Sequence, residues 1–537
     1  MTRFLTLTLV LCMVPPAFAL PRLEAAHVTL DYVAKKAELR AHKPFRSPRA
    51  DLPEFLSKLT YDDYRQIQFR EDQALWKQEG LPFRVEFFHL GYLYQEPVHL
   101  NEFSSTHVQE VRFVPDFFDY GNLRLPSAIP ANTGYAGFRV NLKWANFIGG
   151  GANASVNPPD KWDELGAFQG ASYFRVLGQG QVYGMSARGL ALDCGESGRP
   201  EEFPIFTDWW LGKPQGDDPA LLLYAILDSV SCVGAYEFFI TPGTTTKAQV
   251  EAVVYFRDQR DILAADPQRR ALATIGLAPL TSMFWYGKNS ERKFDDYRPE
   301  VHDSDGLLMH LENGEWEWRP LENGPNLRHQ SFPARNIKGF GLLQRERKFD
   351  CYQDLFHSYE NVPSVWVDPK ECWGEGQIHV VELSTQYEGM DNVVAFWNPS
   401  NKPAPLQPYK FGYSLSWTRE NEVTLSSNIV LTLSSNVVVS TRVGLDPRDQ
   451  RQRQFVVDFE MPMLKTEDGP PKALTSCSDN GAISLVQVFR NTTDNTWRVF
   501  LDLMPKSGNH EPVDMKCTLK RSDGMTSETW SYRWSPP

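Results

Sequence analysis

The stretch YEFFITPGTTTKAQVEAVVYFR, residues 236–257, decides the fold class, because it holds two apolar runs on either side of a tight break. The runs are rich in Val, Ile, Tyr and Phe, which favour strands, and Pro242 and Gly243 end the first run. Runs of the same kind occur at 83–90, 109–118 and 137–145. Many short strands separated by Gly, Pro and Asn predict an all-β protein with a large sandwich or barrel.

Two regions flank this strand-rich part. Before it, residues 52–76 repeat apolar side chains every three or four positions, which predicts one or two short helices. After it, the Pro-rich segment 398–410 is expected to be an extended linker, since proline cannot donate to a sheet. About seven strand candidates in 411–537 then predict an immunoglobulin-like sandwich. The expected domains are therefore 20–397 and 411–537, joined by the linker.

The first 19 residues have the pattern of a secretory signal peptide. Arg3 precedes an apolar run from Phe4 to Val14, and Ala17 and Ala19 form a small-residue cleavage site. The run has about 11 residues, whereas a membrane span needs about 20. We expect cleavage near Ala19 and a periplasmic protein without a transmembrane segment.

Composition narrows the function further. The net charge of −12 opposes a nucleic-acid partner, which would require a basic surface. Aromatic residues make up 13% of the chain and suit the flat faces of sugars, although β cores use the same residues. The chain has no CxxC pair, zinc-ligand spacing, phosphate-binding loop or serine-hydrolase elbow. We therefore expect no metal and no cofactor.

Six cysteines remain after the signal peptide, and an oxidising compartment would allow them to pair. Six cysteines permit 15 pairings, which sequence cannot separate. One option joins neighbours along the chain: Cys194 with Cys232, Cys351 with Cys372, and Cys477 with Cys517.

Segment 290–321 holds the densest group of chemically active residues. Its acidic residues lie around Arg298 and His302, and they are Asp295, Asp296, Glu300, Asp303 and Asp305. Trp316 and Trp318 follow two positions apart, and so on one face of a strand. An inverting glycosidase needs an acid and a base about 6.5–9.5 Å apart, beside rings that hold sugars. The alternative is a solvated turn or a calcium loop.

A second acidic segment places Glu382, Glu388 and Asp391 before an apolar strand that ends at Trp397. Catalytic residues are common on loops that border strands. An ordinary turn at Asp391–Asn392 is the alternative.

The chain resembles the osmoregulated periplasmic glucan biosynthesis proteins G and D over nearly its full mature length. The strings that carry the resemblance are YGNLRLPSAIPANTGYAGFRV (120–140), GASYFRVLGQGQVYGMSARGLALD (170–193), APLTSMFWYG (278–287), DDYRPEVHDSDGL (295–307), NGEWEWRPL (313–321), GFGLLQRERKFDCYQDL (339–355), DNVVAFW (391–397) and SETWSYRW (527–534). The signal peptide is similar to that of the G members, since it lacks the twin arginine of the D members.

The resemblance implies a galactose-mutarotase-like sandwich followed by an immunoglobulin-like domain. It also implies an inverting glycoside hydrolase group acting on β-1,2-linked glucan, with Asp303 as general base and Asp391 as general acid. Glu388 is expected to tune the acid. The other expected substrate-binding or proton-relay residues are Tyr359, Arg298, His302, Asp305, Trp316, Trp318 and Trp397. Gly389–Met390 departs from the family pattern, which puts loop shape and proton delivery there in question.

Two hypotheses follow. In the first, the protein trims, cyclises or branches β-1,2-glucan as a hydrolase or transglycosylase. In the second, it binds glucan without catalysis and guides nascent chains from an inner-membrane glucan synthase, which would be its partner.

Overall fold

The computed structural model describes residues 28–49, 52–125, 128–147, 161–266, 268–290, 294–424, 430–433, 436–446, 449–461 and 469–536. The predicted signal peptide, 1–19, lies outside these residues. Across the described ranges the protein is nearly all β, as predicted. No helix of this part of the chain has the length and apolar character needed to cross a membrane.

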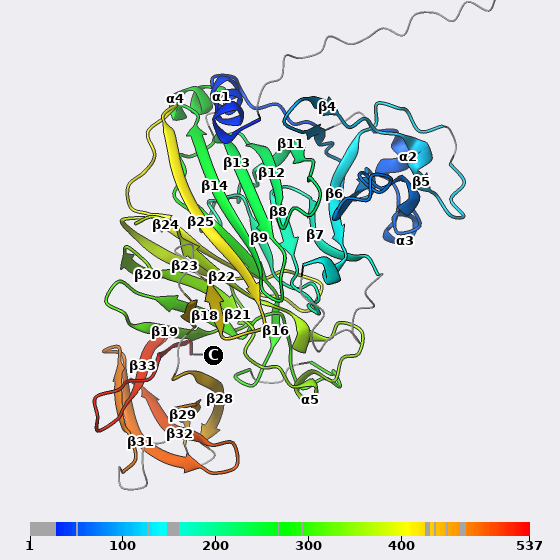
Figure 1. Cartoon of the computed structure of the whole chain (residues 1–537). Helices are drawn as coiled ribbons and strands as arrows, with labels where there is room; N and C mark the ends of the chain where they lie inside the picture. The colour runs from blue at the N-terminus through cyan, green and yellow to red at the C-terminus, as the bar shows by residue number, and fades with distance from the viewer. Residues whose placement is uncertain are drawn as a thin grey trace, which may run out of the picture.

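Two large sheets form the main body (Figure 1). The smaller sheet has this order: β2 (Phe83–His89), β6 (Tyr135–Leu142), β7 (Asp163–Gln169), β8 (Tyr173–Val176), β9 (Ser186–Arg188), β15 (Ile275–Ser282), β24 (Val393–Pro399), β23 (Glu375–Glu382) and β20 (Arg328–Arg335), with β10 (Ala191–Leu192) paired to β15.

The larger sheet has this order: β30 (Lys472–Cys477), β33 (Val513–Lys520), β34 (Thr529–Trp534), β19 (Trp316–Pro320), β18 (Gly306–His310), β21 (Gly339–Leu343), β22 (Ser364–Pro369), β25 (Pro408–Thr418), β14 (Thr246–Phe256), β13 (Cys232–Thr241), β12 (Leu221–Asp228), β11 (Ile205–Gly212), β3 (His99–Phe103) and β4 (Val108–Glu110). The opening stretch forms β13 and β14, which pair antiparallel from Cys232–Phe256 to Thr241–Lys247.

The main core lies between the two large sheets. Rings from the two sheets pack against one another here: Phe138, Phe168 and Phe174 of the smaller sheet, and Trp209 and Phe238 of the larger sheet. The ring centroid of Phe168 lies 5.0 Å from that of Trp209 and 6.1 Å from that of Phe238. The alternation along β13 and β14 directs every second side chain into this layer. This burial of apolar and aromatic surface is the main stabilising term of the sandwich.

The helices are short and peripheral. They are α1 (Leu30–Ala41), α2 (Glu54–Ser57), α3 (Tyr61–Tyr64), α4 (Gln259–Ala265) and α5 (Phe349–Tyr352), with 3₁₀ turns η1 (Glu71–Gln73), η2 (Pro115–Phe117), η3 (Trp144–Asn146) and η4 (Tyr359–Asn361). The helices predicted within 52–76 are therefore confirmed as α2 and α3, each one turn long. Short strands β1 (Gln68–Phe69) and β5 (Phe118–Asp119) pair nearby.

The C-terminal strands lie at the end of the body opposite α1 (Figure 1). One layer is the four-stranded sheet β28 (Val438–Asp446), β29 (Asp449–Phe459), β32 (Thr496–Pro505) and β31 (Gly481–Asn491). The other layer is β30, β33 and β34, which continues the larger sheet because β34 pairs in parallel with β19. A separate hairpin joins β26 (Glu422–Thr424) to β27 (Val430–Thr432).

The expected linker needs correction. Residues 408–410 begin β25, which pairs with β14 on one side and β22 on the other, in the middle of the larger sheet. Pro408 is tolerated because it stands at the first position of the strand. The chain therefore leaves the main body after Thr418, and the boundary expected at 411 falls inside a central strand. The immunoglobulin-like and mutarotase-like types stay predictions.

The neighbouring-cysteine pairs are also not formed: all six described cysteines are free thiols. In the sheet, Cys517 lies opposite Thr475 and Cys477 lies opposite Met515, so the register separates the two thiols.

Candidate functional site

Asp303 lies in the turn after β17 (Val301–His302), which pairs with β16 (Phe284–Tyr286). Its backbone N–H donates to the carbonyl of Met283 at 2.8 Å, and the residue is buried, with 6% exposure. Gly184 lies directly against its carboxyl group. A Cβ at position 184 would come 3.0 Å from Asp303 Cγ and 2.3 Å from Val362 Cγ1. Glycine is therefore required for this close approach.

Asp391 lies in the loop that precedes β24, and the next residue fixes this loop. The buried side chain of Asn392 accepts from the N–H of Phe284 at 2.8 Å and donates to the carbonyls of Phe284 and Leu383 at 3.1 and 2.9 Å. Asn392 thus joins the Asp391 loop to β16, the strand beside Asp303. This arrangement is more than the ordinary turn weighed as the alternative.

The two carboxyl groups have different environments. Burial, and then the negative charge of Asp391, raise the pKa of Asp303 to about 7. The Asp391 side chain is about one-third exposed and lies 3.1 Å from a guanidinium nitrogen of Arg175 on β8. Arg175 is oriented by a second hydrogen bond, from Nε to Ser186 Oγ at 2.6 Å. The site therefore combines a buried carboxyl group whose pKa is raised with a partly exposed carboxyl group that contacts a cation.

Arg298 is the centre of a second charged group, which we call the Arg298 cluster: Asp296, Arg298, Asp354 and Glu388. Its guanidinium lies 2.8 Å from Asp296, 2.8 Å from Asp354 and 2.6 Å from Glu388. The hydrogen bond to Asp296, followed by those to Asp354 and Glu388, raises the pKa of Arg298. The cluster ties the Glu388 loop to the segments that flank Asp303.

Tyr359, at the start of η4, connects the two groups. It is buried, and burial raises its pKa far above the usual range, with further contributions from the charges of Asp303 and Glu388. The structure therefore brings Asp303, Asp391, Glu388, Tyr359 and Arg298 into one region.

His302 and Asp305 face a different space. The ring of His302 contacts Gln344 at 3.0 Å and Glu300 at 3.3 Å, and Asp305 lies 3.7 Å away. Burial alone would lower the pKa of His302, but the charges of Asp305 and Glu300 raise it above the usual value.

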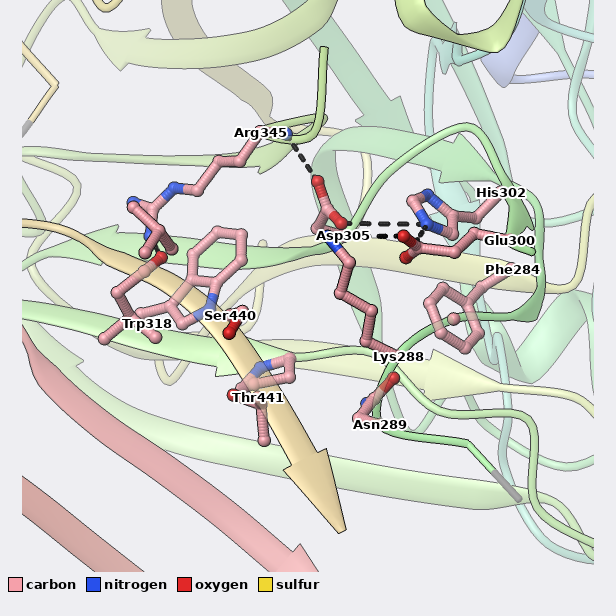
Figure 2. A pocket seen from close by; sticks show the side chains of 14 residues that line it. Phe284, Lys288, Asn289, Glu300, His302, Asp305, Trp318, Arg345, Ser440 and Thr441 are labelled. Atoms are coloured by element: carbon pink, nitrogen blue, oxygen red, sulfur yellow. Dashed lines mark hydrogen bonds and ion pairs between the residues drawn. The ribbon is translucent and has the colours of Figure 1, made fainter. Parts of the chain in front are cut away.

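Figure 2 shows this space, a cavity of about 40 Å³ with Glu300, His302 and Asp305 on one side and Ser440 and Thr441 of β28 on the other. A binding site for a sugar-sized ligand is on the order of 300 Å³ or more. The cavity is therefore too small for a glucose unit, and neither Asp303 nor Asp391 lines it.

Ligand atoms of Glu300, His302 and Asp305 lie within 4.8 Å of one another, which is compatible with a metal ion. However, the ammonium of Lys288 lies 3.3 Å from Glu300 and 2.6 Å from Glu346. Because Lys288 and His302 already offset these negative charges, the cluster gives no reason to propose a metal.

Two of the three tryptophans predicted to contact sugar are buried. Trp397 has no exposed surface and packs in the main core beside Trp373. Trp318 is 3% exposed and lies between the Arg345 guanidinium, 3.7 Å from its ring, and the C-terminal core. Trp316 shares that face and stacks on His310 at 4.0 Å. The expectation of sugar contact fails for Trp397 and Trp318, because the C-terminal layer and the sandwich core cover those faces.

Sequence reasoning missed three residues that hold the site: Arg175, Gly184 and Asn392. Arg175 is a lone charge within the apolar strand YFRV, and that was a usable signal. Gly184 and Asn392 have no signal of their own, since their roles arise from contacts with Asp303 and Phe284, which are distant in sequence.

Comparison with known proteins gives a consistent result. The family model described as "Periplasmic glucan biosynthesis protein, MdoG" matches residues 29–534. A glucans biosynthesis protein G of Serratia proteamaculans is 40% identical over 512 residues, which cover 94% of this chain and 92% of the relative. The protein of that name from Ralstonia nicotianae is 40% identical over 510 residues, covering 94% and 96%. The chain therefore belongs to the MdoG family of periplasmic glucan biosynthesis proteins.

Proposed function

We propose that this protein acts in periplasmic glucan biosynthesis as an enzyme that cleaves or transfers β-1,2-linked glucan, with Asp303 and Asp391 as its catalytic pair. The observation that carries the proposal is the electrostatic coupling of these two carboxyl groups, which come from distant segments and have opposite environments. Inverting glycoside hydrolysis requires two carboxyl groups, one as acid and one as base, and these two are close enough for the charge of one to act on the other.

In the proposed reaction, Asp303 as general base takes a proton from a water molecule that attacks the anomeric carbon. The bond from that carbon to the glycosidic oxygen breaks, and the leaving oxygen takes a proton from Asp391. If a sugar hydroxyl replaces the water, the same step transfers the glucan instead of hydrolysing it. Inversion follows because the attack and the departure occur on opposite faces of the ring.

This division of roles requires a change from the free protein. Burial favours the protonated form of Asp303, so the base becomes competent only as the pH reaches about 7. The Asp391 carboxyl group lies 3.1 Å from Arg175, and this contact must loosen before Asp391 can donate a proton to the glucan. Substrate hydroxyls entering between the two side chains would supply that change.

A glucan-binding protein without catalysis is the second candidate. It is favoured by the Arg175–Asp391 ion pair itself, because a paired carboxylate accepts hydrogen bonds from sugar hydroxyls well and is a poor acid.

The test is incubation of the purified mature protein with linear β-1,2-glucan, with chromatography of the products. New oligosaccharides are expected from the wild type, and their rate should fall at least about 100-fold in Asp303→Asn and Asp391→Asn. Asp261→Asn, the same chemical change at an exposed position on α4, is the control and should keep full activity. Binding of glucan without products from any variant would support the second candidate.

A further inference from the structure

Four of the most exposed large apolar side chains lie next to members of the Arg298 cluster. We call them the rim: Tyr297, Leu355, Phe356 and Tyr387, with exposures of 73%, 86%, 90% and 61%. Tyr297 precedes Arg298, Leu355 and Phe356 follow Asp354, and Tyr387 precedes Glu388. Because Arg298 binds both Asp354 and Glu388, the three segments that carry the rim residues converge on Arg298.

A line of rings leads from the rim to the catalytic pair. Phe356 meets His357 edge-on with centroids 4.9 Å apart, and His357 lies 5.5 Å from the ring of Tyr359. Tyr359 is buried and lies close enough to Asp303 for that charge to raise its pKa. Phe356 of the rim is therefore linked to the proposed active site through His357 and Tyr359.

The backbone holds the rim in its exposed position. The Asp354 carboxylate accepts from the N–H groups of Phe356 and His357 at 2.8 and 2.9 Å, while its other oxygen binds Arg298. Exposing Leu355 and Phe356 to water is unfavourable, and a fixed turn that keeps them there indicates a surface meant to be covered.

The chemistry of the rim fits a neutral sugar chain. Flat amphipathic rings cover the apolar face of a glucose unit. Glu388 and His357, with side chains 31% and 46% exposed, stand beside these rings and can exchange hydrogen bonds with hydroxyl groups. An anionic ligand is disfavoured here, because the Arg298 cluster sets three carboxylates against one guanidinium.

We infer that the rim is a binding subsite for glucose units of a β-linked glucan, at a distance from the bond that is cleaved. The inference rests on the proposed function, since the glucan that reaches Asp303 would extend along the line of rings. The subsite binds glucan chains that are long enough to reach it from Asp303. It adds little affinity for short oligosaccharides.

The first test measures glucan binding by calorimetry, with linear β-1,2-glucan and Asp391→Asn protein, so that no turnover interferes. Adding Phe356→Ala and Tyr387→Ala together should weaken binding by about 10-fold or more, as expected when two stacking rings are removed. Phe356→Tyr should keep most of the affinity. Phe489→Ala, at a 52% exposed phenylalanine on β31, is the matched control and should have no effect. Unchanged binding in the double variant would overturn the subsite.

The second test separates the subsite from the catalytic proposal. In the otherwise wild-type protein, the double variant should raise KM for long glucans severalfold, leave kcat unchanged and leave short oligosaccharides unaffected. Turnover with wild-type KM at every chain length would refute the subsite and leave the catalytic pair intact. Weakened binding in a protein that never turns over glucan would support the subsite and refute the catalytic pair. Sedimentation of the wild type and the double variant tests whether the rim is instead a contact between copies of this chain. If only the wild type self-associates and both proteins bind glucan equally well, the rim is such a contact and the subsite is overturned.

Discussion

Asp303 is the residue whose protonation the site controls most strongly. Its pKa of about 7 lies near neutral pH, and the proposed general base must be deprotonated to act. We therefore expect kcat at saturating glucan, where the Arg175–Asp391 pair has loosened, to rise with pH up to about 7. The measurement is a pH–rate profile on β-1,2-glucan at saturating concentration. A kcat that falls as the pH rises from about 5 to about 7 would contradict the base role, because it would make Asp303 the acid.

The same buried carboxyl makes stability depend on pH. Its pKa is 3.8 in the unfolded chain and about 7 in the folded protein, so between these values only the folded state keeps the proton. The free energy of unfolding therefore falls as the pH rises from about 4 to 7, by on the order of 4 kcal/mol at most.

Asp303→Asn should remove this penalty. The variant is expected to melt a few degrees above the wild type at pH 8 and at nearly the same temperature at pH 4, in thermal unfolding followed by circular dichroism. Asp261→Asn serves as the control at both pH values. An equal difference at pH 4 and pH 8 would show that the ionisation of Asp303 is not the cause.

Among the elements, the contact of the Asp391 loop with β16 depends on one amide. Replacing Asn392 by Ala leaves the N–H of Phe284 and two carbonyls without this partner in a buried place. The expected cost is about 1–3 kcal/mol in a urea unfolding curve. Activity should fall as well, since Asp391 loses its position, whereas Asn313→Ala in an exposed turn should change neither. Normal activity in Asn392→Ala would mean that the loop is held by other contacts.

The sequence predicted whether most elements are strands or helices, but it did not predict which strands pair with one another in the sheets. The two runs in 236–257 form β13 and β14, because apolar and β-branched residues favour the strand conformation locally. The Pro-rich segment led to a wrong prediction of a linker. Proline at the first position of a strand has the same local sequence pattern as proline in a linker, and only the pairing of β25 with β14 and β22 distinguishes the two. The prediction that Trp318 contacts sugar failed for a similar reason. The strand periodicity predicts on which face of the strand Trp318 lies, but it does not predict that the C-terminal layer covers that face.

The site was partly predictable for the same reason. Asp303 and Asp391 were identified through resemblance, and Arg298 and Glu388 through their place in acidic segments. Which of them meet depends on long-range packing, so the contacts of Arg175 and Gly184 could come only from the structure.

At the scale of the whole molecule, a buried ion pair ties the C-terminal layer to the main body. Arg345 follows β21 and lies 2.6 Å from Glu528, whose side chain is fully buried and which also accepts from the N–H of Val438 at 2.8 Å. Removing one partner of a buried pair leaves an uncompensated charge. Asp305 accepts a hydrogen bond from the backbone N–H of the same Arg345. Asp305 is two residues from Asp303, so this junction is linked to the turn that holds the proposed base.

Arg345→Ala should therefore cost about 3–5 kcal/mol and expose the C-terminal layer to limited proteolysis. Asp514→Asn, which breaks a largely exposed pair with Arg533, is the control, with an expected change below about 1 kcal/mol. The measurement is the urea midpoint, with proteolysis as the local readout. Equal effects of the two variants would show that the junction does not depend on this pair.

The most direct test of the central claim, that Asp303 and Asp391 form an inverting catalytic pair for β-1,2-glucan, is proton NMR of the first products released from the linear polymer. The account predicts new reducing ends that appear first as the α anomer and are absent with Asp391→Asn. Products that appear first as the β anomer would contradict inversion. The absence of any product from a protein that binds the glucan would contradict catalysis itself.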